Sequence, residues 1–328
     1  MNKDTSTSGI ITLGEARLAS GGVVHDAQLG YRTWGTLNAA GDNVVILASY
    51  YSGTSASYAP WVEEGPSRIF DPGKYFVIAY DQLGAGNSSK PSTCGGYETW
   101  PQVTCIDSVR AAHKAVTQLG VRHAKLVAGW SMGGMQAFAW AATYPSFASA
   151  AFALCATPGC EVRNEVFLRS IRPMLNMAVH AQDASVQAAA LRAFGAAYAG
   201  WAYSPAFFEG ESMGQAGYTS IANVIDGWEA DHAAMDAQDL LAQLDCWLAT
   251  AAIPQTHVAG CPRVLAMPSS TDRYFAADST TAGKLYRNCN VQVLQSDLGH
   301  IAGRPGIRAQ ETAAIRKAIE FLLVADGH

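Results

Sequence analysis

Apolar residues in the first half of the chain form short continuous runs, which alternate with turns and with amphipathic segments. Short continuous apolar runs are typical of strands buried on both faces, whereas apolar residues three and four positions apart indicate helices. The pattern predicts strands at 43–49, 75–80, 125–129 and 149–156 and helices at 105–119 and 133–144. The first clear strand signal therefore comes at residue 43. This alternation predicts an α/β protein with a mostly parallel central sheet and helices on both faces.

The alternation stops near residue 157, where the character of the chain changes. Residues 158–254 are rich in Ala and aromatic residues and have almost no β-branched runs, which predicts a helical cap. Strand patterns return at 263–267 and 291–294, and a closing helix is expected at about 310–323. We therefore expect a core built from residues 1–157 and 255–328, interrupted by a cap at 158–254.

Composition and charge narrow the class of protein. The 328 residues are 49% hydrophobic and 15% charged, with a formal net charge of −5, as expected of a globular enzyme. No run of Lys and Arg indicates nucleic acid as a partner, and no segment has the apolar length of a signal peptide or membrane span. The seven cysteines show no C-x-x-C spacing and no nearby pair of histidines, so we expect reduced thiols, no metal, no cofactor and a cytoplasmic protein.

A motif for nucleophilic catalysis lies between the predicted strand at 125–129 and the helix after it. Residues 129–133 read Gly-Trp-Ser-Met-Gly, which matches the G-x-S-x-G nucleophile elbow of α/β-hydrolases. Small residues two positions before and after Ser131 allow a sharp turn, and the following helix directs backbone N–H groups at the same place. The motif predicts that Ser131 is the nucleophile of an acyl-serine enzyme, although a Gly-Ser turn without chemistry is the alternative.

A serine nucleophile needs a base and an acid, and in this fold they follow it in the order acid, then histidine. His300 comes after a late strand, between two glycines, and Asp272 comes after the preceding strand. We expect His300 to be the base and Asp272 to orient it. Asp297 is the alternative acid, but it lies on the same segment as His300 and is expected to face water.

The developing oxyanion needs two N–H donors. One is expected from Met132, the residue after the nucleophile, and the other from the loop after the strand at 43–49. We favour Tyr51 in that loop, with Tyr50 close behind. The tyrosines can equally form pocket wall. Tyr50, together with Trp130, Ile301 and Trp228, is the expected substrate pocket.

These residues are similar to those of a known family. The segments Tyr31–Asn38 and Trp130–Gln136, with Asp272 and the pair Gly299–His300, resemble the homoserine O-acetyltransferase branch of the α/β-hydrolase fold. The resemblance implies the triad Ser131, Asp272 and His300, oxyanion donors at Tyr51 and Met132, and a helical cap through which the protein forms a homodimer.

Three departures from that family bear on the reaction. The elbow of the family has Gly where this chain has Trp130, and an acid follows its histidine where this chain has Ile301. Neither Arg163 nor Arg169 falls in the register of the family's substrate-binding arginine. We therefore favour hydrolysis of a small ester or amide by a hydrolase-like member of the branch. Acyl transfer to an amino-acid or other acceptor is the alternative, and a non-catalytic ligand-binding protein is a remote one.

Overall fold

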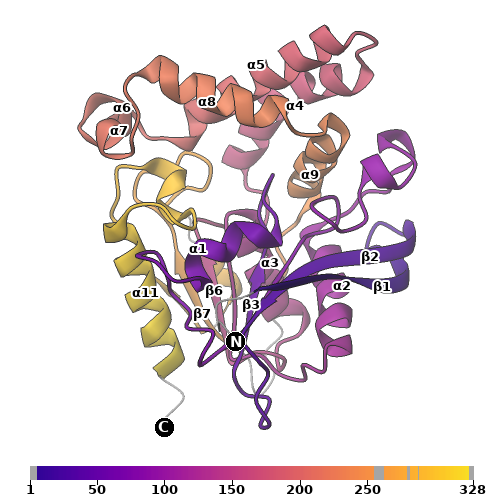
Figure 1. Ribbon diagram of the computed structural model, residues 1–328, viewed down its shortest axis with the longest axis vertical. Coiled ribbons are helices and arrows are strands. Elements are labelled where there is room, and N and C mark those ends of the chain that lie inside the picture. The colour runs from indigo at the N-terminus through magenta and orange to yellow at the C-terminus, as the bar shows by residue number, and fades with distance from the viewer. Residues whose placement is uncertain (1–5, 255–261, 279–280, 287, 325–328) are drawn as a thin grey trace.

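The central sheet runs through the whole core of the protein, whose computed structural model describes residues 6–254, 262–278, 281–286 and 288–324 (Figure 1). The strand order in the described residues is β1-β2-β4-β3-β5-β6-β7-β8, and β3 to β8 are parallel, which confirms the predicted mostly parallel sheet. The strands are β1 (Thr7–Arg17), β2 (Val23–Trp34), β3 (Val44–Ala48), β4 (Phe76–Tyr80), β5 (Leu126–Trp130), β6 (Ala150–Leu154), β7 (Arg263–Met267) and β8 (Cys289–Val291).

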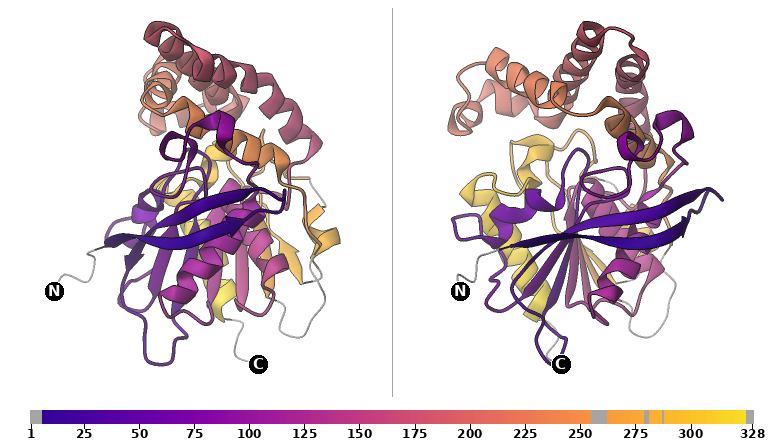
Figure 2. Two further views of the ribbon diagram at one scale, coloured as in Figure 1. Left: turned by 90° about the vertical axis from the view of Figure 1, so that its right-hand side faces the viewer. Right: turned by 45° about the vertical axis from the view of Figure 1, so that its right-hand side comes forward.

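Helices cover both faces of this sheet, which is why its central strands are wholly apolar. The core helices are α1 (Ala59–Val62), α2 (Cys105–Gln118), α3 (Met132–Thr143), α10 (Thr281–Leu285) and α11 (Ala309–Val324). Helix α11 lies on one face and α2 on the other (Figure 2). Every residue of β3, β5 and β6 is buried as a result.

Between β6 and β7 the chain forms a layer of helices above the carboxyl ends of the strands (Figure 1). This layer consists of α4 (Val162–His180), α5 (Ala184–Ala202), α6 (Pro205–Glu209), α7 (Ser212–Gln215), α8 (Ile221–Ala233) and α9 (Ala237–Ala249). We call these helices the cap, and we propose that they form the inserted unit expected at 158–254. The predicted boundary at residue 255 lies outside the described residues.

The first clear strand signal in the sequence, at residue 43, belongs to the third strand, because β1 and β2 form an antiparallel hairpin before it. Register shifts on both sides of Gly14 interrupt the alternation of apolar and polar residues along β1. The eighth strand was also misplaced: it spans Cys289–Val291 rather than 291–294, and Leu294 forms only an isolated bridge with Ser269.

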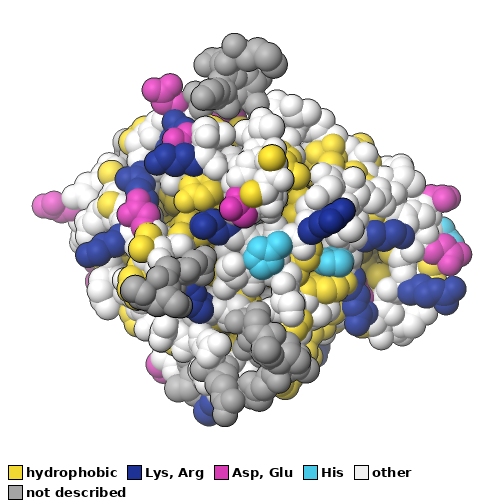
Figure 3. Space-filling view, turned by 90° about the horizontal axis from the view of Figure 1, so that it is seen from below, with side chains coloured by type: hydrophobic (Ala, Val, Ile, Leu, Met, Phe, Trp, Pro, Cys, Tyr) yellow, Lys and Arg dark blue, Asp and Glu magenta, His cyan; other side chains and the backbone are white. Residues whose placement is uncertain are grey.

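The face opposite the cap carries basic side chains that are separated by acidic, apolar and uncharged ones (Figure 3). None of the helices in the described part of the chain is both long enough and apolar enough to cross a membrane.

The N-terminal hairpin contributes to the core, and this can be tested by comparing two apolar residues on it. Leu29 on β2 is fully buried, whereas Ile10 on β1 is 55% exposed. We expect Leu29→Ala to lower the free energy of unfolding by about 2–5 kcal/mol. Ile10→Ala is the control and should change it by less than about 0.5 kcal/mol. Urea unfolding followed by tryptophan fluorescence measures both, and equal effects would contradict the packing described here.

Candidate active site

Ser131 lies at the turn between β5 and α3 with an uncommon backbone conformation, φ +59° and ψ −128°. A Cβ atom on Gly129 would lie 2.2 Å from the backbone carbonyl carbon of Gly133, and one on Gly133 would lie 2.2 Å from the carbonyl oxygen of Ala48. Both positions therefore require glycine, because three backbone segments approach one another here. The spacing of the sequence motif thus follows from the close contact of strand, turn and helix.

His300 and Asp272 come from loops after different strands and form a buried hydrogen bond. His300 Nδ1 lies 2.8 Å from Asp272 Oδ2, and both side chains are almost completely buried. The other carboxylate oxygen accepts hydrogen bonds from the backbone amides of Tyr274 at 2.8 Å and Phe275 at 3.1 Å. Since a carboxylate can only accept, the proton of a neutral imidazole is on Nδ1, which leaves Nε2 as a proton acceptor.

The alternative acid, Asp297, has other partners. Its Oδ1 lies 2.8 Å from Arg308 Nη2, and its Oδ2 accepts a hydrogen bond from the Ser212 hydroxyl. Ser212 belongs to α7, so its hydrogen bond to Asp297 joins the cap to the core segment before α11. Asp297 is therefore engaged in a contact between cap and core, and Asp272 is the acid that His300 contacts.

Two backbone N–H groups near Ser131 remain available. Met132 is the first residue of α3, and its amide has no earlier turn of helix to donate to. Tyr51 lies in the loop after β3. Within the described residues, neither amide donates a hydrogen bond to another protein group. The partial positive charge at the start of α3 adds to the field that these amides present to an anion.

A cavity of about 140 Å³ lies between the core loops and the cap. All of the predicted site residues line it except Asp272, which is behind His300, and Met132. The predicted residues in its wall are Tyr50, Tyr51, Trp130, Ser131, Trp228, His300 and Ile301. The others are Ser52, Gly53, Ser57, Tyr198, Asp231, His232, Met235, Tyr274 and Arg304. The structure thus brings the candidate nucleophile and the candidate base to one small space.

Trp130 is both a wall of this cavity and a support for the imidazole. Its indole Nε1 donates a hydrogen bond to the backbone carbonyl of His300 at 3.2 Å, and its ring stacks on the His300 ring at 5.0 Å and 27°. Tyr50 packs edge-on against the indole at 4.5 Å. Gly303 leaves room for the indole, because a Cβ there would lie 2.5 Å from the ring. The orientation of His300 therefore depends on Trp130.

His232 also lines the cavity, although its place in the sequence does not by itself mark it as a site residue. It lies on α8 four residues after Trp228, stacks on that indole at 12°, and is 3% exposed. Its Nδ1 lies 2.8 Å from the Trp228 carbonyl oxygen, and Nε2 has no hydrogen-bond partner among the described groups. Burial lowers the pKa of His232, so the ring is neutral near pH 7. Its helical spacing from Trp228 was the signal available in the sequence.

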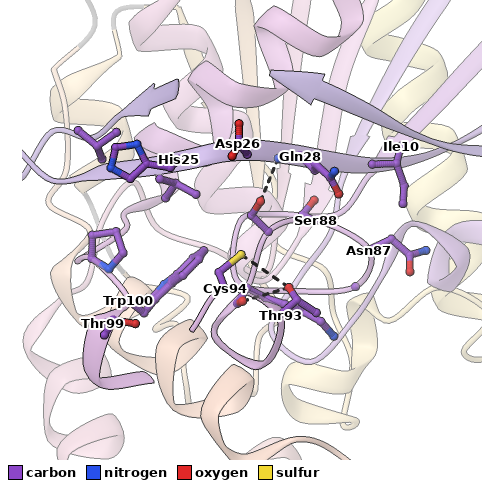
Figure 4. Close-up of a pocket in the computed structure, with 16 residues that line it drawn as sticks. Ile10, His25, Asp26, Gln28, Asn87, Ser88, Thr93, Cys94, Thr99 and Trp100 are labelled. Carbon is purple, nitrogen blue, oxygen red and sulfur yellow. Dashed lines mark hydrogen bonds between the residues drawn. The ribbon is translucent and has the colours of Figure 1, made fainter. Parts of the chain in front are cut away.

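A larger groove of about 800 Å³ lies elsewhere, between the N-terminal hairpin and residues 86–101 (Figure 4). It is lined by His25, Asp26, Cys94 and Trp100 among others, and by none of the predicted site residues. It therefore holds neither the candidate nucleophile nor its base. No group of three or more His, Cys, Asp or Glu in the described residues is placed to hold a metal ion.

The chain is similar to proteins of known fold and to several known enzymes. Residues 44–205 match the family model of the alpha/beta hydrolase fold. The chain is 28% identical over 317 residues to an ethyl acetate hydrolase of Pseudomonas veronii, a match that covers 89% of this chain and 88% of the relative. The solved structure of the acetyl esterase MekB superposes with a TM-score of 0.87 at 27% identity and covers 97% of this chain and 96% of that one.

The chain is also 36% identical over 146 residues to a homoserine O-acetyltransferase of Chlorobium chlorochromatii (strain CaD3). That match covers 42% of this chain and 41% of the relative. These findings confirm the predicted α/β-hydrolase fold and the resemblance to the homoserine O-acetyltransferase branch, and they show that the chain is also similar to esterases.

The buried, neutral His232 makes stability depend on pH in a defined direction. Burial lowers the pKa of His232 in the folded protein below the ordinary value of about 6.5. As the pH falls, His232 therefore binds a proton more readily in the unfolded chain than in the folded protein. Stability should therefore decrease as the pH falls below about 6.5. We expect His232→Gln to lose less unfolding free energy between about pH 7.5 and 5 than the wild type does.

Urea unfolding at a series of pH values measures this dependence. The control is His25→Gln, whose imidazole is 75% exposed and whose loss should leave the dependence almost unchanged. An identical pH dependence in His232→Gln and the wild type would contradict the prediction.

Proposed function

We propose that this chain, an α/β-hydrolase-fold enzyme of the hydrolase or acyltransferase kind, hydrolyses short-chain esters through an acyl-serine on Ser131. The observation that carries the proposal is the small cavity shared by Ser131 and His300. At about 140 Å³ it is well below the 300–1,000 Å³ of common ligand pockets. Such a space suits an acetyl or similarly short acyl group.

The proposed reaction has two half-reactions. His300 Nε2 takes the proton of the Ser131 hydroxyl as Oγ attacks the ester carbonyl, and the tetrahedral oxyanion accepts hydrogen bonds from the amides of Tyr51 and Met132. The C–O bond to the alcohol then breaks, and the alcohol leaves with the proton from His300. Water attacks the acyl-serine, His300 takes a proton from it, and Ser131 regains its proton as the acid departs.

Asp272 supports both half-reactions without exchanging a proton itself. Its hydrogen bond to His300 Nδ1 holds the tautomer in which Nε2 is free to accept. The carboxylate also stabilises the imidazolium that forms each time His300 takes a proton. Two backbone amides on its other oxygen keep the carboxylate in place.

Two observations favour water over an acceptor alcohol or amine in the second half-reaction. In sequence, the ethyl acetate hydrolase matches 89% of this chain, whereas the homoserine O-acetyltransferase of Chlorobium chlorochromatii matches 42%. In addition, the residue after His300 is Ile301, a buried apolar side chain in the cavity wall that cannot bind an ammonium group.

Acyl transfer is the second candidate, and one observation favours it. Arg304 and Asp231 both line the cavity, one from the core and one from the cap. A guanidinium and a carboxylate at one site complement the two charges of an amino-acid acceptor.

Two further expectations accompany the proposal. We propose that the protein forms a homodimer through the cap, and the exposed side chains of Val162, Val166 and Met177 on α4 support this. The cytoplasmic location stays a prediction.

The choice between water and an acceptor can be tested with ethyl acetate in the presence and absence of homoserine. We expect acetic acid to form at the same rate with and without homoserine. Water reaches the acyl-serine, and Ile301 offers no partner to the ammonium group of homoserine. Ser131→Ala is the control and should lower kcat by about 10⁴-fold or more. NMR of the products distinguishes the outcomes. Acetylated homoserine formed at the expense of acetic acid would reject hydrolysis in favour of transfer.

The size of the acyl group should depend on Trp130. Removing its indole opens the cavity, so Trp130→Ala should raise kcat/KM for ethyl hexanoate relative to ethyl acetate by about 10-fold or more. The absolute rates should fall, because His300 loses the stacking and the Nε1 hydrogen bond. Trp100→Ala, in the groove of Figure 4, is the control and should leave the ratio unchanged. An unchanged ratio in Trp130→Ala would show that the indole does not limit the acyl group.

A further inference from the structure

We propose that Gln82 and Gln243 are positioning residues that fix the direction of the Tyr51 amide, so that helix α9 of the cap is part of the oxyanion-binding apparatus. The inference rests on the proposed function, in which that amide is one of the two donors. Gln82 follows β4 and Gln243 lies on α9, and both are almost completely buried.

The first step concerns the peptide unit that contains the Tyr51 N–H. A trans peptide is planar, so its carbonyl oxygen and its amide hydrogen point in opposite directions. The carbonyl of this unit belongs to Tyr50, and it accepts hydrogen bonds from Gln82 Nε2 at 3.4 Å and from the Gly53 amide at 2.9 Å. Holding the carbonyl therefore aims the Tyr51 N–H the opposite way.

The second step concerns the next peptide unit. The Ser52 amide donates a hydrogen bond to Gln243 Oε1 at 3.0 Å. Ser52 has a positive φ of 59°, in the left-handed region that residues other than glycine seldom adopt. Gln243 therefore holds the loop in a conformation that it would not favour by itself. The peptide planes on both sides of the Tyr51 Cα are thus fixed by side chains.

The two glutamines also fix each other. Gln243 Nε2 donates to the Asp239 carbonyl at 3.1 Å, and because a carbonyl can only accept, Gln243 Oε1 must face the loop. Gln82 Nε2 lies 3.4 Å from that same oxygen. Gln82 Oε1 accepts from Gln136 Nε2 on α3 at 3.2 Å. A buried amide network therefore runs from the cap through the loop to the helix that follows the nucleophile.

A second contact ties the same loop to α9. The Tyr51 hydroxyl donates to the Leu240 carbonyl at 3.2 Å, one turn before Gln243. Helix α9 thus holds the loop through a side-chain amide and through a backbone carbonyl. A purely structural role for Gln243 would make this network a source of stability alone, and the two roles differ in what they predict for catalysis.

The experiment compares Gln243→Met with Gln238→Met in the full-length protein. Gln238 lies on the same helix, and its Oε1 accepts from the Tyr97 amide at 2.8 Å in a loop away from the cavity. Gln238→Met loses this bond from α9 to a core loop, and Gln243→Met loses the bond to the Ser52 amide together with the longer contact to Gln82 Nε2. We expect Gln243→Met to lower kcat for ethyl acetate by about 10–100-fold with KM changed less than about 3-fold, and Gln238→Met to lower kcat by less than about 2-fold.

Affinity for a trifluoromethyl ketone, which forms a tetrahedral oxyanion on a serine, gives a readout that stability alone would not change. It should fall in Gln243→Met by the same factor as kcat/KM. Equal kcat values in the two glutamine variants, or unchanged affinity for the ketone, would overturn the inference. If Gln243→Met does not fold, Gln82→Met is measured against Gln238→Met by the same criteria.

The wild type is assayed first, so that the two proposals fail separately. A wild type that does not hydrolyse ethyl acetate would overturn the proposed function. An active wild type with a fully active Gln243→Met would overturn only the inference about the network.

Discussion

The close approach of three backbone segments at Ser131 is the constraint on which the rest of the site depends. The backbone is closest where β5 meets the start of α3 and the end of β3. A Cβ atom on Gly129 or Gly133 would overlap neighbouring backbone atoms there. The turn between them holds Ser131 at a positive φ, at the carboxyl edge of the sheet. Because β3, β4, β6, β7 and β8 are parallel to β5, the loops that follow these strands reach the same edge. The candidate base, the acid and the oxyanion loop all arrive there for that reason.

Trp130 links two properties of the site, the size of the cavity and the orientation of the candidate base. The indole limits the cavity beside Ser131, and it also supports His300 through ring stacking and a hydrogen bond to its backbone carbonyl. A change at this position must therefore alter the space for the acyl group and the orientation of the base together. This coupling gives a physical reason why a bulky residue before the candidate nucleophile is compatible with the proposed hydrolysis of small esters.

The cap contributes to the site from several helices and does more than cover it. Helices α5 and α8 supply Tyr198, Trp228 and His232 to the wall of the cavity. Helix α7 is joined to the core through Ser212 and Asp297, and α9 holds the loop after β3 through Gln243. Because these cap residues form part of the cavity wall, a change in them alters the space that a substrate can occupy.

Local pattern was enough to predict the elements whose signal lies within one stretch of sequence. The buried strands, the elbow at 129–133 and the chain order of Ser131, Asp272 and His300 were readable because burial on both faces and the sharp turn each require particular residues nearby. The N-terminal hairpin was missed because the irregular register around Gly14 breaks its alternation.

Only the tertiary structure decided which distant groups meet. Both acids were candidates, Asp272 because it precedes His300 in the order that the fold uses and Asp297 because it is close to His300 in the chain. In the structure, Asp272 contacts His300, and Asp297 binds Arg308 and Ser212. Likewise, Gln82 and Gln243 are 161 positions apart and become partners only when the cap folds onto the core. The reason is that a hydrogen bond between distant segments depends on how the elements pack, and the residue pattern along the chain carries no record of that packing.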